Sequence, residues 1–281
     1  MLGCEEDTKK PSGESPESNQ TSAAPTDVMP DQVAKINVDD NETLDNILAG
    51  AIDWDKFQKG GTEHLYYAPN EQTPYTGWAK EMHDNGQIRA LGQMKDGKKE
   101  GLATEWYWNG QKEWEVNYKD GKWDGLSTVW YRNGQKRLAR NYKDGKLDGL
   151  STEWYENGQK RLAINYKDGK PDGIYRDWYN NGQKKWENTY KNGKLEGLRT
   201  KWYFSGQKMH ELIYKEGKLV TAVAWKINGG KCPHTKVMNG NGIVVEYSKT
   251  EYSSRKGEIW FEFYKDGEFV EDSRGPTAPP P

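Results

Sequence analysis

The sequence has few of the residues from which metal sites, disulfide frameworks and membrane spans are built. Its 281 residues include two cysteines, Cys4 and Cys232, and four scattered histidines. Two cysteines make no disulfide framework, and Cys232-Pro233-His234 lacks a second pair of ligands, so we expect no bound metal. No stretch approaches the ~20 apolar residues that a membrane-spanning helix needs. We therefore look for function in binding surfaces rather than in metal sites or membrane spans.

Aliphatic residues are also scarce, which limits the kind of core the chain can form. Hydrophobic residues make up 33% of the sequence, but 13 tryptophans and 17 tyrosines supply much of that share. Such a composition favours a thin core of large aromatic side chains carried on strands. Paired carboxylates, a Ser/His/Asp set and a glycine-rich phosphate loop are all missing, so we expect neither an enzyme nor a cofactor.

Charge is distributed unevenly along the chain. Residues 1–60 hold 13 acidic and 5 basic residues, whereas the whole chain has a net charge of −2. The remainder is therefore mildly basic, but its basic residues are not concentrated in one patch. Nucleic acid is for this reason not an expected partner.

The dominant feature is a 24-residue unit that recurs six times over residues 77–220. Its clearest copy runs from Gly125 to Asp148, and no insertion interrupts the series. The turn glycine of the unit recurs at Gly86, Gly110, Gly134, Gly158, Gly182 and Gly206. A fixed period over six copies predicts a repeat architecture.

Each unit contains two turn sequences of the kind that joins hairpin strands. In the clearest copy these are Asn133-Gly134 and Asp144-Gly145. Both dipeptides are typical of type I′ turns, in which the two central residues have positive φ. The sequence therefore predicts a two-residue hairpin turn at each of these sites.

The segments between the turns alternate in the manner of strands. We expect one strand from Leu126 to Arg132, with Leu126 and Trp130 on the same face in the core, and a second from Gln135 to Lys143. Gly125, just before the first strand, would permit a bulge that bends the sheet. The predicted fold is all-β, an elongated open meander of hairpins with a short N-terminal helix and disordered termini.

The residues on either side of the array predict its ends. Residues 39–76 would hold a short amphipathic helix, over 39–52, and a leading half-repeat that covers the first edge. Residues 221–271 look like diverged terminal repeats that act as a cap. Residues 272–281, rich in proline, predict a disordered tail.

The start of the chain suggests an anchor. Leu2-Gly3-Cys4 resembles the bacterial lipobox, in which the cysteine becomes the lipidated first residue, although the apolar segment of a signal peptide is missing. Residues 8–30 are polar and rich in Ser, Pro and Thr, so we expect residues 1–38 to be a lipobox-like start followed by a disordered tether. We therefore expect Cys4 to be lipidated and the protein to be held in a cell envelope.

A row of tyrosines is the candidate binding ladder. These tyrosines directly follow the tryptophan of each unit, at Tyr107, Tyr131, Tyr155, Tyr179 and Tyr203. If exposed, they suit the recognition of proteins or carbohydrates. The alternative is that each ring packs on the stems of neighbouring lysines and arginines, and the residues leave both open.

The unit Gly-Leu-x-Thr-x-Trp-Tyr-x-Asn-Gly-Gln-Lys, followed by Tyr-Lys-Asp-Gly-Lys-x-Asp-Gly, resembles the MORN repeat in its bacterial variant form. The resemblance covers roughly residues 65–270. It implies a β-hairpin array that serves binding rather than catalysis. Bacterial proteins of this kind are commonly described as antitoxin components of toxin–antitoxin systems.

We therefore expect a non-enzymatic scaffold that binds a protein partner and lies in the cell envelope. A first alternative is a cytoplasmic antitoxin or immunity protein that binds a cognate toxin through the same sheet. A second alternative is a glycan-binding surface module that uses the tyrosine ladder.

Overall fold

The computed structural model describes residues 41–61, 64–247 and 259–275. The chain forms two compact units, residues 1–44 and residues 45–281. Only the last four residues of the first unit are described, and they begin helix α1 (Asn41–Gly50), which matches the helix predicted over 39–52. The predicted tether and Cys4 lie outside the described residues.

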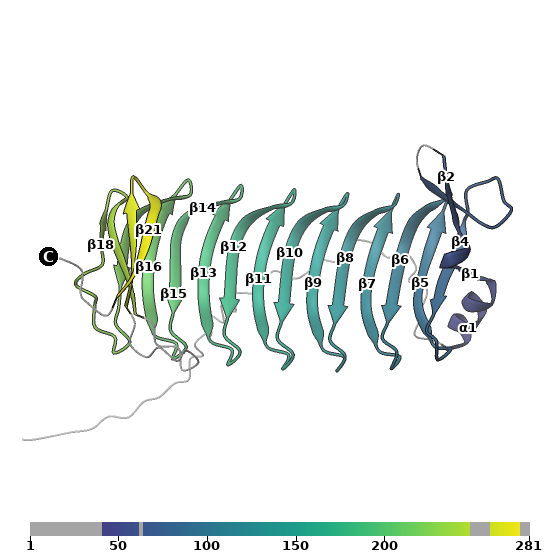
Figure 1. The fold of residues 1–281 in the computed structure, drawn as a ribbon, viewed down its shortest axis with the longest axis horizontal. Helices are drawn as coiled ribbons and strands as arrows, with labels where there is room; N and C mark the ends of the chain where they lie inside the picture. The colour runs from purple at the N-terminus through teal and green to yellow at the C-terminus, as the bar shows by residue number, and fades with distance from the viewer. Residues whose placement is uncertain (1–40, 62–63, 248–258, 276–281) are drawn as a thin grey trace, which may run out of the picture. The chain divides into compact units, whose positions relative to one another are not determined.

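The repeats form one continuous antiparallel sheet (Figure 1), as predicted. Each strand pairs with the next along the chain, except that β14 and β15 both pair with β13. The strands are β4 (Gly77–Met82), β5 (Ile88–Lys95), β6 (Lys98–Trp106), β7 (Lys112–Lys119), β8 (Lys122–Trp130), β9 (Lys136–Lys143), β10 (Lys146–Trp154), β11 (Lys160–Lys167), β12 (Lys170–Trp178), β13 (Lys184–Lys191), β14 (Lys194–Leu195), β15 (Gly197–Trp202), β16 (Lys208–Lys215) and β17 (Lys218–Ala224).

The two hairpin turns of each repeat differ from each other. At the Asp-Gly turn, Asp144 and Gly145 have φ of 49° and 80°, which is the predicted type I′ turn. At the Asn-Gly turn only Gly134 has positive φ, and its N–H donates to the carbonyl of Tyr131 at 2.9 Å. This is a three-residue loop, a type I turn closed by a glycine in the left-handed region. The type I′ prediction was therefore wrong there.

The glycine near the start of each repeat forms a bulge inside a strand. Gly125 has φ of 98°, and the pairing register between β7 and β8 shifts beside it. The prediction of a bulge is confirmed. The strand nevertheless begins at Lys122 and ends at Trp130 rather than running from Leu126 to Arg132, because the chain stays extended through the bulge.

The N-terminal end of the sheet is closed by a short parallel pairing. β1 (Ile52–Asp53) pairs with β4 and is followed by a 3-10 helix, η1 (Trp54–Lys56). β2 (Gln58–Gly60) and β3 (Leu65–Tyr67) form a separate two-stranded sheet. The residues expected to form a half-repeat therefore do not extend the repeat sheet as a further hairpin.

Only the last residues of that segment make the backbone hydrogen bonds that are typical of the repeats. The N–H of Gly97 donates to the carbonyl of Tyr75 at 2.8 Å, and the N–H of Asp96 donates to Oγ1 of Thr76 at 2.9 Å. The same two positions are bonded in the following repeats, so the repeat pattern begins at Tyr75.

The C-terminal end continues the antiparallel meander through four more strands. These are β18 (Lys236–Met238), β19 (Asn241–Tyr247), β20 (Ile259–Lys265) and β21 (Glu268–Gly275). Trp225 still bridges to Lys231, as expected of a diverged repeat. Because β21 reaches Gly275, the segment assigned to a tail from residue 272 begins as strand.

The hydrophobic clusters of the described residues lie at this C-terminal end. One cluster joins Leu212 and Leu219 of the repeats to Val244 of β19, and the other joins Ala224 to Phe261 of β20. β19 and β20 thus cover one face of β16 and β17. From β7 to β13 the main contacts of each described strand are with its neighbours in the sheet, so this stretch is a single layer.

Candidate binding surface

Cross-strand register assigns the side chains of the repeats to two faces, because directly opposed residues point to the same side of a sheet. Leu126 is opposite Asn141, whereas Ser127 is opposite Arg140. We call the side of Leu126 and its equivalents the leucine face, and the side of Arg140 and its equivalents the arginine face.

The predicted tyrosine ladder connects each repeat to the next. The hydroxyl of Tyr131 donates to the carbonyl of Trp154, 23 residues later, at 2.8 Å. The other members make the same bond: Tyr107 to Trp130 at 2.8 Å, Tyr155 to Trp178 at 2.7 Å, Tyr179 to Trp202 at 2.9 Å and Tyr203 to Trp225 at 2.8 Å. The first four side chains are half-buried and Tyr203 is buried. Occupied hydroxyls favour packing over recognition for this row.

The recurring acidic residue and the turn asparagine also join consecutive repeats. The carboxylate of Asp124 accepts the N–H of Asp144 at 3.1 Å, in the next Asp-Gly turn. Nδ2 of Asn133 donates to the carbonyl of Glu156 at 3.1 Å, in the next Asn-Gly turn. Most of the repeated polar residues thus hold the array together, and they leave few groups for catalysis.

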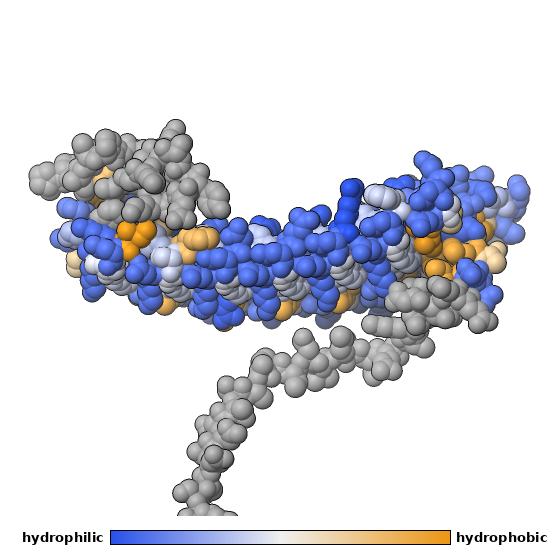
Figure 2. Space-filling view, turned by 90° about the horizontal axis from the view of Figure 1, so that it is seen from below, coloured by the Kyte–Doolittle hydropathy of each residue, from blue (hydrophilic) through white to orange (hydrophobic). Residues whose placement is uncertain are grey.

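The leucine face carries a row of exposed aliphatic side chains. Leu126, Leu150, Ile174 and Leu198 occupy the same position in four consecutive repeats, with exposed fractions of 41%, 48%, 41% and 50%, and Ile213 (45%) and Val223 (37%) continue the row on β16 and β17. Figure 2 shows hydrophobic patches that recur along one rim of the central repeats, and further hydrophobic patches at the two ends of the array.

The ionic groups that accompany this row are paired within the same face. Nε of Arg176 donates to Glu187 at 2.7 Å, and Nζ of Lys184 reaches the same carboxylate at 2.9 Å. On β16, Lys208 pairs with Glu211 at 2.5 Å. The leucine face therefore offers an apolar row in which the neighbouring carboxylates Glu187 and Glu211 are already paired.

The arginine face is covered at both ends. At the N-terminal end Trp54 lies beside Gly92, where an added Cβ would be 3.6 Å from the indole, and Lys99 lies 5.0 Å from the Trp54 ring centroid. At the C-terminal end Lys201 pairs with Glu246 of β19. The open part of this face lies between these two covers.

Four buried side-chain atoms among the described residues have no hydrogen-bond partner, and all belong to the arginine face. They are Nε of Arg140, Oδ1 of Asn188, Nε of Arg199 and Nδ1 of His210. Burial, together with the positive charges of Lys201 and Arg199, holds the pKa of His210 well below its usual value. His210 is therefore neutral at pH 7.

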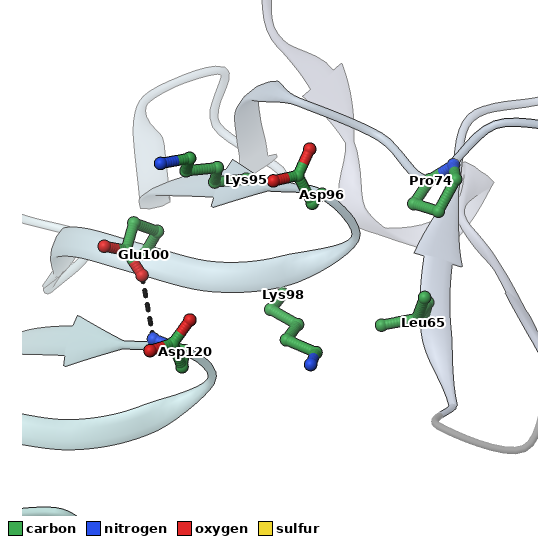
Figure 3. A pocket seen from close by; sticks show the side chains of 7 residues that line it. All are labelled: Leu65, Pro74, Lys95, Asp96, Lys98, Glu100 and Asp120. Carbon is green, nitrogen blue, oxygen red and sulfur yellow. Dashed lines mark hydrogen bonds between the residues drawn. The ribbon is translucent and has the colours of Figure 1, made fainter.

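A shallow pocket lies at the N-terminal end of the array (Figure 3). Its volume is about 370 Å³, and Leu65 and Pro74 line it together with residues from the first Asp-Gly turns. The carboxylate of Glu100, which lines the pocket, accepts the N–H of Asp120 at 2.8 Å. This group therefore stabilises the Asp-Gly turn. Within the described residues no group of His, Cys, Asp or Glu is placed to hold a metal ion.

The hairpins β10–β11 and β12–β13 match a known repeat family. Residues 147–168 and 171–192 match the family model described as MORN repeat variant. These two repeats are MORN repeat variants. The copies on either side make the same tyrosine and turn contacts as the two matched MORN variants. Comparison with curated proteins finds no match to this chain. No described helix has the length and apolarity to cross a membrane.

Reasoning from the sequence missed the exposed row. Leu126 was placed in the core beside Trp130, because strands normally bury their apolar face against a second layer. No described element covers that face between β8 and β13, so the leucine or isoleucine at this position stays exposed. Its regular recurrence was visible in the sequence, but its exposure was not.

Proposed function

We propose that this protein is a non-enzymatic scaffold that binds a protein partner along its leucine face. One observation carries the proposal: six exposed aliphatic side chains follow each other on one face, from Leu126 on β8 to Val223 on β17. The chain as a whole is strongly hydrophilic, with a mean hydropathy of −1.12. Exposed apolar side chains aligned on one face of such a hydrophilic protein favour an interaction site there.

The surroundings of the row have the composition of a protein interface. Protein–protein interfaces combine an apolar centre with a polar, hydrogen-bonding rim. Here Asn141 and Asn165 lie opposite Leu126 and Leu150 within the row, while paired charges such as Arg176 and Glu187 lie beside it. A partner could therefore bury the row beside Glu187 without leaving that carboxylate unpaired.

The direct test is to replace two central members of the row. The variant Leu150→Glu/Ile174→Glu should lose at least tenfold in the amount of partner recovered by affinity capture from native cells, because both glutamates would be desolvated in the interface. Val270→Glu is the matched control, since Val270 is 57% exposed but lies on β21, away from the row. Equal recovery by all three proteins, with unchanged melting curves, would refute the proposal.

We further propose that Cys4 is lipidated and anchors the scaffold in the cell envelope. The support is the Leu2-Gly3-Cys4 sequence followed by a polar stretch over residues 8–30. Membrane fractionation and a mass spectrum of the N-terminal peptide test this. A diacylglyceryl mass on Cys4 is expected, whereas an unmodified Met1 in the soluble fraction would refute anchoring and favour the cytoplasmic antitoxin.

The glycan-binding alternative has less support. It relied on exposed tyrosines such as Tyr131 and Tyr155, whose hydroxyls donate to Trp154 and Trp178. If wall polysaccharide nevertheless bound to the protein and the binding disappeared when both tyrosines became alanine, the glycan module would replace the protein scaffold.

A further inference from the structure

We infer that the partner on the leucine face is a second copy of this chain, packed face to face about a two-fold axis. This rests on the proposed function, since it names the occupant of the same surface. The structural starting point is the spacing of the row. Leu126, Leu150, Ile174 and Leu198 are each separated by two strands, or about 9.6 Å.

The aliphatic side chains of the row recur at a fixed spacing. A partner whose own side chains recur at the same spacing can contact every member of the row. A second copy has this period by construction, and a two-fold axis that lies between the two faces, parallel to the strands, preserves it while reversing the order of the repeats. Such an interface is isologous, so each contact between the copies occurs twice. With the axis between Leu150 and Ile174, each of these side chains would meet the other on the second copy.

The size of the row suits a stable dimer. From β8 to β17 the row crosses nine strands, counting β15 as the continuation of β14, which is roughly 40 Å at about 4.8 Å per strand. Strand segments of about six residues add a width of ~20 Å, so the footprint is about 800 Å² on each copy. This is the area that a typical specific interface buries on each partner.

Two carboxylates on the leucine face are already paired. Glu187 is paired with Arg176 and Lys184, and Glu211 is paired with Lys208, so neither carboxylate would enter the interface as an unpaired charge. The buried unpartnered atoms of the described residues, such as Nε of Arg140, lie on the opposite face. Packing two leucine faces would therefore not change the surroundings of these atoms. Aligned sheets that pack this way form an ordinary β-sandwich.

Sedimentation velocity of the purified full chain tests the inference. The wild-type protein and Val270→Glu should sediment as dimers at micromolar concentration. Leu150→Glu/Ile174→Glu and Leu150→Lys/Ile174→Lys should each sediment as monomers, with a dissociation constant raised at least tenfold, because like charges would meet across the axis. Melting curves matching wild type would show that both variants are folded.

Mixing the two charged variants supplies a second, independent readout. An equimolar mixture of the acidic and basic variants should form a heterodimer, since glutamates of one copy would then meet lysines of the other. A monomeric wild-type protein, or a mixture that stays monomeric, would overturn the second-copy inference. The proposed function would fail separately, if the capture experiment recovered the same proteins with the glutamate variant as with wild type.

Discussion

Each repeat devotes single residues to holding its successor. The Tyr155 hydroxyl donates to the carbonyl of Trp178 at 2.7 Å, and the carboxylate of Asp148 accepts the N–H of Asp168 at 3.2 Å. A 24-residue hairpin cannot bury enough surface to fold alone, so its stability depends on such bonds to neighbouring repeats. The recurrence of tyrosine, aspartate and asparagine in the sequence follows from this requirement.

Removing one of these bonds should have a small, measurable cost. Tyr155→Phe deletes the hydroxyl but keeps the ring, so the free energy of unfolding should fall by about 1 kcal/mol, the usual net value of one hydrogen bond. Urea denaturation of the full chain measures this difference. Tyr118, which lies on the arginine face and outside the ladder, provides a Tyr→Phe comparison. An equal or larger loss at Tyr118 would argue against the ladder.

Arg140 is a residue whose replacement should stabilise the fold. Its equivalents in neighbouring repeats are Val116 and Ile164, which are 0% and 6% exposed, whereas Nε of Arg140 is buried without a partner. Arg140→Ile should raise the free energy of unfolding by about 1 kcal/mol, because an unsatisfied buried donor costs about 1–3 kcal/mol. A lower urea midpoint for this variant would contradict that reading of the site.

At the scale of elements, the turn glycines are required by backbone conformation. Gly134 has φ of 80°, and a Cβ added there would meet Nε2 of Gln111 at 3.5 Å, an ordinary contact. The cost of substitution therefore comes from φ rather than from a clash. Gly134→Val should lower the free energy of unfolding by about 1–3 kcal/mol, as expected for a β-branched residue held in the left-handed region.

Asparagine provides the control at this turn, because it tolerates the left-handed region better than valine does. Gly134→Asn should lower the melting temperature less than Gly134→Val. Equal melting temperatures for the two variants would show that the turn does not constrain φ.

The C-terminal cap should respond to mild acid through His210. This ring lies 5.2 Å from Trp186, faces Lys201, Arg199 and Glu246, and has a pKa held well below 6.5 by burial and by the two cations. The folded state therefore binds this proton less readily than the unfolded state, so its contribution to stability is present above pH 6.5 and declines as pH falls below it.

Comparing wild type with His210→Gln isolates this residue. The free energy of unfolding of wild type should fall between pH 6.5 and pH 5, while that of His210→Gln should change less over the same interval. Chemical denaturation at both pH values gives the two slopes. Identical slopes would mean that His210 does not couple the cap to pH.

At the scale of the whole molecule, the sequence predicted the period, the hairpins and the continuous sheet, because those features depend on local turn chemistry. It did not predict that the leucine face would lack a second layer, since that depends on where distant strands pack. β19 and β20 cover the arginine face at β16 and β17, and β2 and β3 form a small sheet of their own. Contacts between such distant segments cannot be predicted from a 24-residue repeat pattern.

The central claim is that this scaffold binds through its leucine face. A photo-reactive amino acid placed at Leu150, on that face, or at Leu162, on the arginine face, tests it in the native cell. Crosslinks to a protein, whether a second copy or another chain, should form from position 150 and not from position 162. Crosslinks from position 162 alone would contradict the account and assign binding to the arginine face.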